Sequence, residues 1–486
     1  MASRSSPTRV RASVVLAAAA ALGSVLASPA GASAATPAIT VRPAGASPIS
    51  GIEDDRLLNV ANPVPRMRIL ASAGASLTRV GLRWDVVATA RPAAPTNPAD
   101  PAYDWSRYDA IVAAARARRI QVLFTVYGTP AWARDPSVGP DSRFPESAIR
   151  PFDAADFGHF AQAAAQRYAP LGVHKWEGWN EPNIELFLRP QYVRSGLGWT
   201  PVSPATYSAL QAAFYSGIKA ADRTAIVAGG VTAPVGDRCA APGDCPLDVA
   251  PTRVMPDAFI TALGVAGLRP PMDVVSHHPY PLRAPANVTP ANRSYVDLYN
   301  LTRLTTAIDR TYLKGKKLWL TEYGFATRPV AAYRTYFSKA RQAAYIADAY
   351  RRTKANRRVS LIVYYLLQDH SQWASGVLER SGAPKPGYQA LALPFAATPP
   401  GRVRRGVLVT LVGQVRPSPT ATTVLVQRRS GRVWVTIKRV RTTRDGSFKL
   451  TLRPSATVVL RTRWRGRTRA GTIATNISPP VAISVR

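Results

Sequence analysis

Short apolar segments alternate with alanine-rich stretches of helical periodicity along most of this 486-residue chain. Strands that are each followed by a helix pair in parallel, and eight is the number that closes a barrel. An open doubly wound sheet is the alternative, but no glycine-rich phosphate turn follows the first strand. We therefore predict an α/β fold, a (β/α)8 TIM barrel. The expected strands are 48–53, 77–84, 121–127, 174–179, 225–230, 272–277, 317–322 and 360–366, and the expected helices are 108–118, 153–168, 205–221, 257–266, 298–312 and 340–354.

The composition changes at Thr398-Pro399-Pro400-Gly401, which predicts a domain boundary. Beyond it, short runs rich in Val, Leu and Thr alternate with arginine-rich turns, a pattern typical of a small antiparallel β-sandwich. The pattern resembles the immunoglobulin-like modules of secreted bacterial enzymes. We predict a barrel over 35–397 and a basic sandwich over 398–486, with strands at 407–412, 423–428, 434–440, 447–452, 457–464 and 481–485.

The N-terminus has the features of a secretory signal. Three arginines precede an apolar run from Ala12 to about Ala27, and Ala32-Ser33-Ala34 supplies small residues for cleavage. We predict a signal peptide over 1–34, and a retained anchor is the less favoured alternative. No later run is long enough to cross a bilayer, so we expect no transmembrane segment after cleavage and a secreted, extracellular or envelope-associated protein.

Cys239 and Cys245, the two cysteines of the chain, lie in one polar loop. An oxidising compartment and this short spacing favour a local structural disulfide between them.

Positive charge is concentrated in the second region. The formal net charge is +35, and residues from Pro399 onward contain 19 Lys and Arg but a single acid, Asp445. This excess predicts attraction to anionic envelope polymers, although a basic composition that only keeps the domain soluble explains it equally well. Nucleic acid is not expected, because no binding motif accompanies the charge.

Two glutamates end apolar runs, Glu181 in Trp179-Asn180-Glu181-Pro182-Asn183 and Glu322 in Leu320-Thr321-Glu322-Tyr323-Gly324. Barrels mount catalytic groups at the C-terminal ends of their strands, and two carboxylates there suffice to cleave a glycosidic bond with retention. The pair resembles the motifs of clan A glycoside hydrolases, especially families 39 and 5, over about residues 48–393. The resemblance implies that Glu181 is the acid/base, that Glu322 is the nucleophile and that Asn180 binds the substrate 2-hydroxyl.

The resemblance also implies the neighbours of this pair. Arg83, at the end of the second strand, is similar to the arginine that orients the nucleophile, and His278 and Tyr280 match a histidine and a tyrosine of the clan. Adjacent residues of a strand face opposite ways, so we expect His278 rather than His277 to reach the site. Glu177 should lie lower on its strand. Glu185, Glu53 and Asp54 are further carboxylates to which we give supporting positions only.

Aromatic residues in the loops after strands could stack on sugars or simply pack the loops. Trp132 follows the third strand in Thr129-Pro130-Ala131-Trp132, which is similar to family 39. The eighth strand departs from the clan because Tyr364-Tyr365-Leu366-Leu367 has no tryptophan, and we expect Trp373 to replace it from the loop.

These features predict a secreted retaining O-glycosidase that acts on a polysaccharide or oligosaccharide. A glycan-binding envelope protein with little turnover and a transglycosylase are the alternatives, and the intact glutamate pair argues against the former. No phosphate loop, serine nucleophile elbow or metal-ligand cluster is seen in the sequence, so we expect no cofactor and no metal.

Overall fold

The computed structural model describes residues 47–486 except 197, 238, 240–243, 282, 285–294, 331–334, 419 and 469–472. The chain divides into the units Met1–Ala38 and Ile39–Arg486, and all that follows concerns the second unit. The predicted signal peptide lies outside the described residues.

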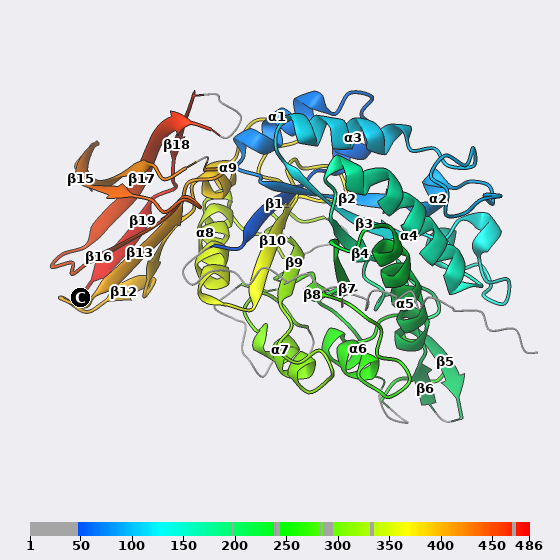
Figure 1. Ribbon diagram of the computed structural model, residues 1–486. Coiled ribbons are helices and arrows are strands. Elements are labelled where there is room, and N and C mark those ends of the chain that lie inside the picture. Colours follow the sequence, from blue (N-terminus) through cyan, green and yellow to red (C-terminus); the bar gives the residue numbers. More distant parts are fainter. Residues whose placement is uncertain are drawn as a thin grey trace, which may run out of the picture. The chain divides into compact units, whose positions relative to one another are not determined.

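Eight parallel strands close into a barrel, as predicted (Figure 1). Around the barrel each strand pairs with its sequence neighbour, and the first strand pairs with the last. In chain order the strands are β1 (Ile49–Glu53), β2 (Leu77–Arg83), β3 (Gln121–Tyr127), β4 (Lys175–Gly178), β7 (Ile226–Thr232), β8 (Val274–His277), β9 (Leu318–Tyr323) and β10 (Val359–Tyr365).

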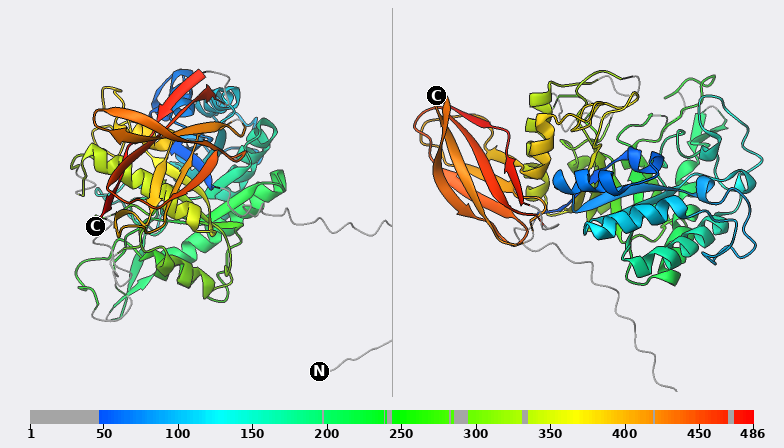
Figure 2. Two further views of the ribbon diagram at one scale, coloured as in Figure 1. Left: turned by 90° about the vertical axis from the view of Figure 1, so that its left-hand side faces the viewer. Right: turned by 90° about the horizontal axis from the view of Figure 1, so that it is seen from above.

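Helices surround this barrel (Figure 2). They are α1 (Val64–Ser72), α2 (Trp84–Val87), α3 (Ser106–Ala117), α4 (Ala154–Tyr168), α5 (Ser203–Ala221), α6 (Pro256–Leu263), α7 (Thr302–Asp309), α8 (Lys339–Ala355) and α9 (Pro386–Ala392). Short 3-10 turns lie at Asp55–Asn59, Ala131–Ala133, Glu146–Ala148 and Ala169–Leu171, and a two-stranded ribbon of β5 (Tyr192–Ser195) and β6 (Gly198–Pro201) precedes α5.

Alternate residues of each strand point into the barrel, where they form layers of different polarity. One layer is apolar and includes Leu77, Leu123 and Trp319. Two residues further along β2 and β3 the inward positions are Arg79 and Thr125, both buried. This second layer is polar, and it supports the chemistry at the strand ends.

The C-terminal domain consists of two packed sheets, confirming the predicted β domain. One sheet contains β11 (Phe395–Thr398), β13 (Val409–Gln414) and β16 (Ser447–Leu452). The other contains β12 (Gly401–Val403), β14 (Thr423–Ser430), β15 (Val433–Arg441), β17 (Val458–Arg467), β18 (Ile473–Ile477) and β19 (Val481–Val485). Pairing is antiparallel except between β12 and β19. Because β11 pairs with β13, the sheet begins three residues before the composition changes.

Two further features bear on the sequence predictions. Cys239 and Cys245 are joined by a disulfide, which confirms the expected pairing. Among the helices of the described segments, none is long and apolar enough to cross a membrane.

Candidate active site

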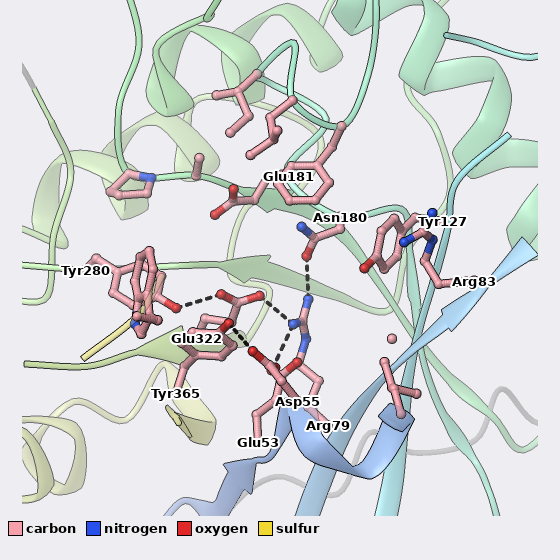
Figure 3. A pocket seen from close by; sticks show the side chains of 18 of the residues that line it. Glu53, Asp55, Arg79, Arg83, Tyr127, Asn180, Glu181, Tyr280, Glu322 and Tyr365 are labelled. Atoms are coloured by element: carbon pink, nitrogen blue, oxygen red, sulfur yellow. Dashed lines mark hydrogen bonds and ion pairs between the residues drawn. The ribbon is translucent and has the colours of Figure 1, made fainter. Parts of the chain in front are cut away.

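A cavity of about 700 Å³ opens at the C-terminal ends of the barrel strands (Figure 3). Its floor carries Arg79, Asn180, Glu181, Tyr280 and Glu322, which come from β2 and from the ends of β4, β8 and β9. Side chains from strand ends, from α3 and from the loops after the strands complete the wall, among them Asp55, Arg83, Arg107, Tyr127, Phe187, Arg253, Tyr365 and Trp373.

The backbone after β4 is held in an unusual conformation that directs Glu181 into this cavity. Trp179 and Glu181 have φ values of 69° and 40°. Both values lie in the left-handed region, which residues other than glycine rarely occupy. Such strain persists only where the surroundings impose it. Trp179 is fully buried against Phe157, and its indole N–H donates to the Phe187 carbonyl at 2.8 Å.

Asn183 fixes the same turn from its other end. Its side-chain nitrogen lies within hydrogen-bond distance of three carbonyls, those of Ala233, Val235 and Val254, and its Oδ1 accepts from the Ala233 N–H at 2.7 Å. The tight Trp-Asn-Glu-Pro-Asn sequence therefore serves a structural purpose on both sides of Glu181.

Glu181 and Glu322 face one another across the cavity. One carboxylate oxygen of each, together with a ring nitrogen of His278, lie within 4.8 Å of one another. Both carboxylates are nearly buried, each with a side-chain exposure of 13%. The sequence predicts this juxtaposition, because each residue ends a barrel strand.

His278 and Tyr280 bind the two glutamates from β8 and its following loop. Nδ1 of His278 lies 2.8 Å from Oε1 of Glu181, and the Tyr280 hydroxyl donates to Oε2 of Glu322 at 2.7 Å. Nε2 of His278 faces the Arg79 guanidinium at 3.4 Å, so we assign Nε2 as the acceptor and Nδ1–H as the donor to Glu181.

His277 points away from the cavity, as expected from strand alternation. Its ring bonds Thr232 Oγ1 and the Val296 carbonyl, and burial lowers its pKa to about 3. It is a neutral core residue.

The arginine that orients Glu322 is Arg79, and the expectation that Arg83 does so is wrong. Arg79 Nη1 donates to Glu322 Oε1 at 2.5 Å, whereas the Arg83 guanidinium forms a two-pronged ion pair with Asp85. Arg79 and Arg83 both lie on the inward face of β2. They are four residues apart, which places Arg83 about 13 Å further along the strand than Arg79. Arg83 therefore lies at the rim of the cavity, where a role in substrate binding remains a prediction.

Arg79 is the centre of a buried network. Its Nε donates to Glu177 at 2.7 Å, its Nη1 also donates to Glu53 at 3.0 Å, and its Nη2 donates to Asn180 Oδ1 at 2.7 Å. Only 3% of its side chain is exposed. A guanidinium presents five donors in a rigid fork, and here nearly all of them fix groups of the candidate site.

The carboxyl groups around this cation have different protonation tendencies. Burial raises the pKa of Glu181, and the charge of Glu322 acts in the same direction, against the hydrogen bond from His278. Burial likewise raises the pKa of Glu53 well above its ordinary value. Burial opposes ionisation of Glu177 too, but Arg79 and His278 with the Ser276 and Thr125 hydroxyls outweigh it and lower its pKa. The surroundings thus stabilise the anionic form of Glu177 and raise the proton affinity of Glu181.

Asn180 and Trp373 also line the cavity, where their roles in substrate binding stay predictions. Asn180 accepts from Arg79 through Oδ1, so its Nδ2 donor lies at the other end of the amide. Trp373 enters the cavity from the loop after β10 and packs edge-on against Tyr280 and Tyr365, with centroid distances of 5.3 and 5.4 Å.

Trp132 does not take the predicted position in the cavity wall. Its indole N–H donates to the Ala88 carbonyl, its ring meets Trp84 edge-on at 5.6 Å, and the Arg91 guanidinium covers it at 4.4 Å. It packs the β3 loop against the α2 region, which is the alternative that an aromatic residue in a loop always offers.

Glu181, His278 and Glu322 could each present one ligand atom to a cation. However, the Arg79 guanidinium and the Tyr280 hydroxyl already occupy the two oxygens of Glu322. A second positive charge beside Arg79 would be repelled, so the donor set favours proton chemistry over metal binding.

Arg79 is the main residue that sequence reasoning missed. Its parity on β2 is the signal that could have found it, since Arg79, Gly81 and Arg83 all lie on the inward face and line the cavity. Asp55 and Tyr365 were also missed. The Tyr365 hydroxyl donates to Asp55 at 2.6 Å across the ends of β10 and β1, a contact that requires the closed barrel.

The fold and the site together define a (β/α)8 barrel that carries a buried carboxyl pair at its C-terminal face and is followed by a β domain. No family model matches the chain, and no curated protein matches it. Among solved structures, the exo-β-1,4-mannosidase Op5Man5 from Opitutaceae bacterium strain TAV5 is similar at 14% identity, with a TM-score of 0.44, over 73% of this chain and 61% of that chain. An engineered protein is similar at 12% identity, with a TM-score of 0.38, over 91% of this chain and 94% of that one. The chain thus spans 61% of the mannosidase's length.

Proposed function

We propose that the barrel is a retaining O-glycosidase in which Glu181 is the acid/base and Glu322 the nucleophile. The observation that carries this proposal is that one carboxylate oxygen of Glu181 and one of Glu322 lie within 4.8 Å of each other in a cavity. Retaining enzymes keep their carboxyl groups about 5–5.5 Å apart, whereas inverting enzymes leave room for a water between them at about 6.5–9.5 Å.

The surroundings of the pair support the division of roles. Glu181 has a raised pKa, so it keeps the proton that it must donate to the glycosidic oxygen. Glu322 accepts from Arg79 and Tyr280, and these two donors hold its carboxylate in position as the attacking group. In the first step Glu322 bonds the anomeric carbon while Glu181 protonates the departing oxygen. In the second, Glu181 takes a proton from water as that water displaces Glu322.

The substrate is proposed as a neutral β-linked glycan of the glucan or xylan type, with uronate-containing glycans second. Arg83, Arg107 and Arg253 line the wall of the cavity, and two of them are paired with an aspartate, Arg83 with Asp85 and Arg253 with Asp237. Most of the positive charge at the rim is therefore neutralised, which favours an uncharged sugar. The predicted signal peptide and the disulfide support action outside the cytoplasm.

Turnover of a panel of aryl glycosides, followed by NMR of the first-formed anomer, tests the function and the stereochemistry together. We expect retention, and loss of activity by a factor of about 10³ or more on Glu181→Gln or Glu322→Gln. Glu146→Gln, which removes an exposed carboxylate, should be silent. Azide should restore turnover to Glu322→Ala and give the glycosyl azide of inverted configuration.

An inverted first product, or near-normal turnover by either glutamine variant, would overturn the mechanism. Product analysis with an added sugar acceptor separates hydrolysis from transglycosylation, because both pass through the same covalent intermediate. Binding of glycans without turnover of any would favour the envelope-binding alternative.

A further inference from the structure

One face of the six-stranded sheet in the C-terminal domain carries arginines on three neighbouring strands. On β17, Trp464 and Leu460 point into the core, so the alternate residues Arg461, Arg463 and Arg465 point outward. Cross-strand partners share a face, and pairing through β14 places Arg439 of β15 on that same face, with Leu425 between it and Arg463. Arg429 and Arg441 lie on this face as well. We call Arg429, Arg439, Arg441, Arg461, Arg463 and Arg465 the arginine face.

No carboxylate compensates this charge. The sole acid beyond Pro399 is Asp445, which lies outside the strands of this sheet. Its oxygens accept from the Ser47 N–H and the Ser447 hydroxyl, both at 2.8 Å. Within the described part of the C-terminal domain, the arginine face therefore has no anionic partner on its own sheet.

At least one guanidinium of the face is held in place rather than left free in solvent. Arg461 Nε donates to Gln427 at 2.9 Å, and its Cζ lies 4.2 Å above the ring of Trp434. Fixing a cation beside Arg463 costs side-chain entropy and electrostatic repulsion, a cost that solubility alone does not require. A charge that is already fixed binds an anion with less loss of freedom.

The chemistry of the face narrows the class of ligand. All six cations are arginines, and the guanidinium fork matches the two oxygens of a carboxylate. They repeat at about 6.6 Å along a strand and about 10 Å across two strands, which suits a linear chain with regularly spaced anions. Arg461 covers one face of Trp434, the aromatic residue of these rows, which leaves less of the ring available for stacking on nucleic-acid bases.

We propose that the arginine face binds a linear acidic polysaccharide through its carboxylates and holds the barrel against that polymer. The proposal is separable from catalysis, because the residues of the face lie in the sandwich and none of them lines the cavity of the barrel. On this proposal, part of the excess positive charge of the domain lies on one sheet and binds a specific class of ligand.

The test uses residues 35–486, polygalacturonate as the probe and dextran as the neutral control. Arg439→Gln/Arg463→Gln/Arg465→Gln removes three charges from the face, and Arg404→Gln/Arg405→Gln/Arg444→Gln removes three exposed charges elsewhere in the same domain. We expect the face variant to bind polygalacturonate about tenfold or more weakly, with a shallower dependence on salt, and the control to change by less than about threefold. Thermal unfolding and turnover of an aryl glycoside should stay unchanged in both.

Equal losses in the two triple variants would show that net charge alone acts, and would overturn the proposal. So would tighter binding to phosphatidylglycerol vesicles, to polyphosphate or to duplex DNA than to polygalacturonate. Failure of the glycosidase assay leaves this binding experiment intact, since polymer capture is measured without turnover.

Discussion

At the scale of single residues, Arg79 has more influence on the candidate site than any other side chain that we describe. It contacts Glu322, Asn180 and His278 directly, and it separates the charges of Glu53 and Glu177. Replacing the Arg79 guanidinium by a lysine ammonium would leave several of these acceptors without a donor.

Arg79→Lys should therefore lower kcat by a factor of about 10² to 10³, with a smaller change in KM, because an ammonium cannot bind these acceptors in one plane. Arg83→Lys is the matched control from the same strand and should change kcat less than about fivefold, since Arg83 pairs with Asp85 at the rim. Steady-state kinetics on an aryl glycoside checks both. A larger loss in the Arg83 variant would restore the assignment made from sequence.

The protonation of Glu181 depends on its neighbour. Because the Glu322 charge raises the pKa of Glu181, Glu322→Gln should lower that pKa. Titration of carboxyl groups by carbon NMR would measure it, with Glu146→Gln as a control that leaves the value unchanged. In the wild-type protein, turnover should fall as pH rises through the pKa of Glu181, because the acid then loses the proton that it must donate. An unchanged or higher pKa in Glu322→Gln would contradict the coupling.

At the scale of elements, the barrel depends on close contact between α4 and α5. Gly217 of α5 lies against Gly158 of α4 so closely that a Cβ at Gly217 would be 2.1 Å from the Gly158 carbonyl oxygen. Any larger residue must push the two helices apart.

Gly217→Ala should lower the free energy of unfolding by about 2–4 kcal/mol, even though alanine favours helices, because the backbone of α4 cannot move aside without disturbing its packing. Gly139→Ala, at a site with open space around it, should be within about 0.5 kcal/mol of wild type. Urea denaturation followed by circular dichroism compares them. Equal stability of the two variants would show that the helices separate at little cost.

The eight strands and the two catalytic candidates could be predicted because they depend on local pattern. Buried parallel strands are apolar runs, and each glutamate immediately follows such a run. The helix α1 was missed because Val64–Ser72 contains two arginines and begins beside prolines, which hides its periodicity. Strand β12 was missed because it has only three residues, and β18 was missed because Ile-Ala-Thr-Asn-Ile does not alternate between apolar and polar residues.

By contrast, the depth of a side chain below the rim of the cavity and the direction in which it points can be known only from the closed barrel. Sequence reasoning found the correct face of β2 but chose the wrong arginine, because the pattern gives no measure of how far a side chain lies below the rim. The position of Trp132 could not be predicted for the same reason. Nothing in Thr129-Pro130-Ala131-Trp132 indicates that Arg91 covers the ring of Trp132.

At the scale of the whole molecule, one tyrosine of α8 connects the barrel to the β domain. The Tyr350 hydroxyl donates to the Gly413 carbonyl at 3.0 Å, and the Arg416 guanidinium lies 4.9 Å from the centre of its ring. Both partners belong to β13 or the turn after it. Unfolding of one domain should therefore destabilise the other.

Tyr350→Phe should cost about 1 kcal/mol through the lost hydrogen bond, and Tyr350→Ala about 3–5 kcal/mol through a cavity between the domains. Differential scanning calorimetry checks this, and we expect the alanine variant to broaden or split the transition. Tyr215→Phe, which loses a partly buried hydrogen bond to Asp273 within the barrel, should shift the transition slightly without broadening or splitting it. A sharp, unshifted transition in Tyr350→Ala would show that the domains unfold independently.

The network around Arg79 also bears on how such a protein can change over generations. A single side chain from β2 links β1, the C-terminal end of β4, β9 and the residue after β8, so it closes the barrel wall as well as arranging the chemistry. On the proposed mechanism, exchange of Glu181 would remove turnover, whereas loss of Arg79 would leave Glu177 as a buried, uncompensated charge. We therefore expect that a related protein that binds glycans without cleaving them would lose Glu181 before it loses Arg79.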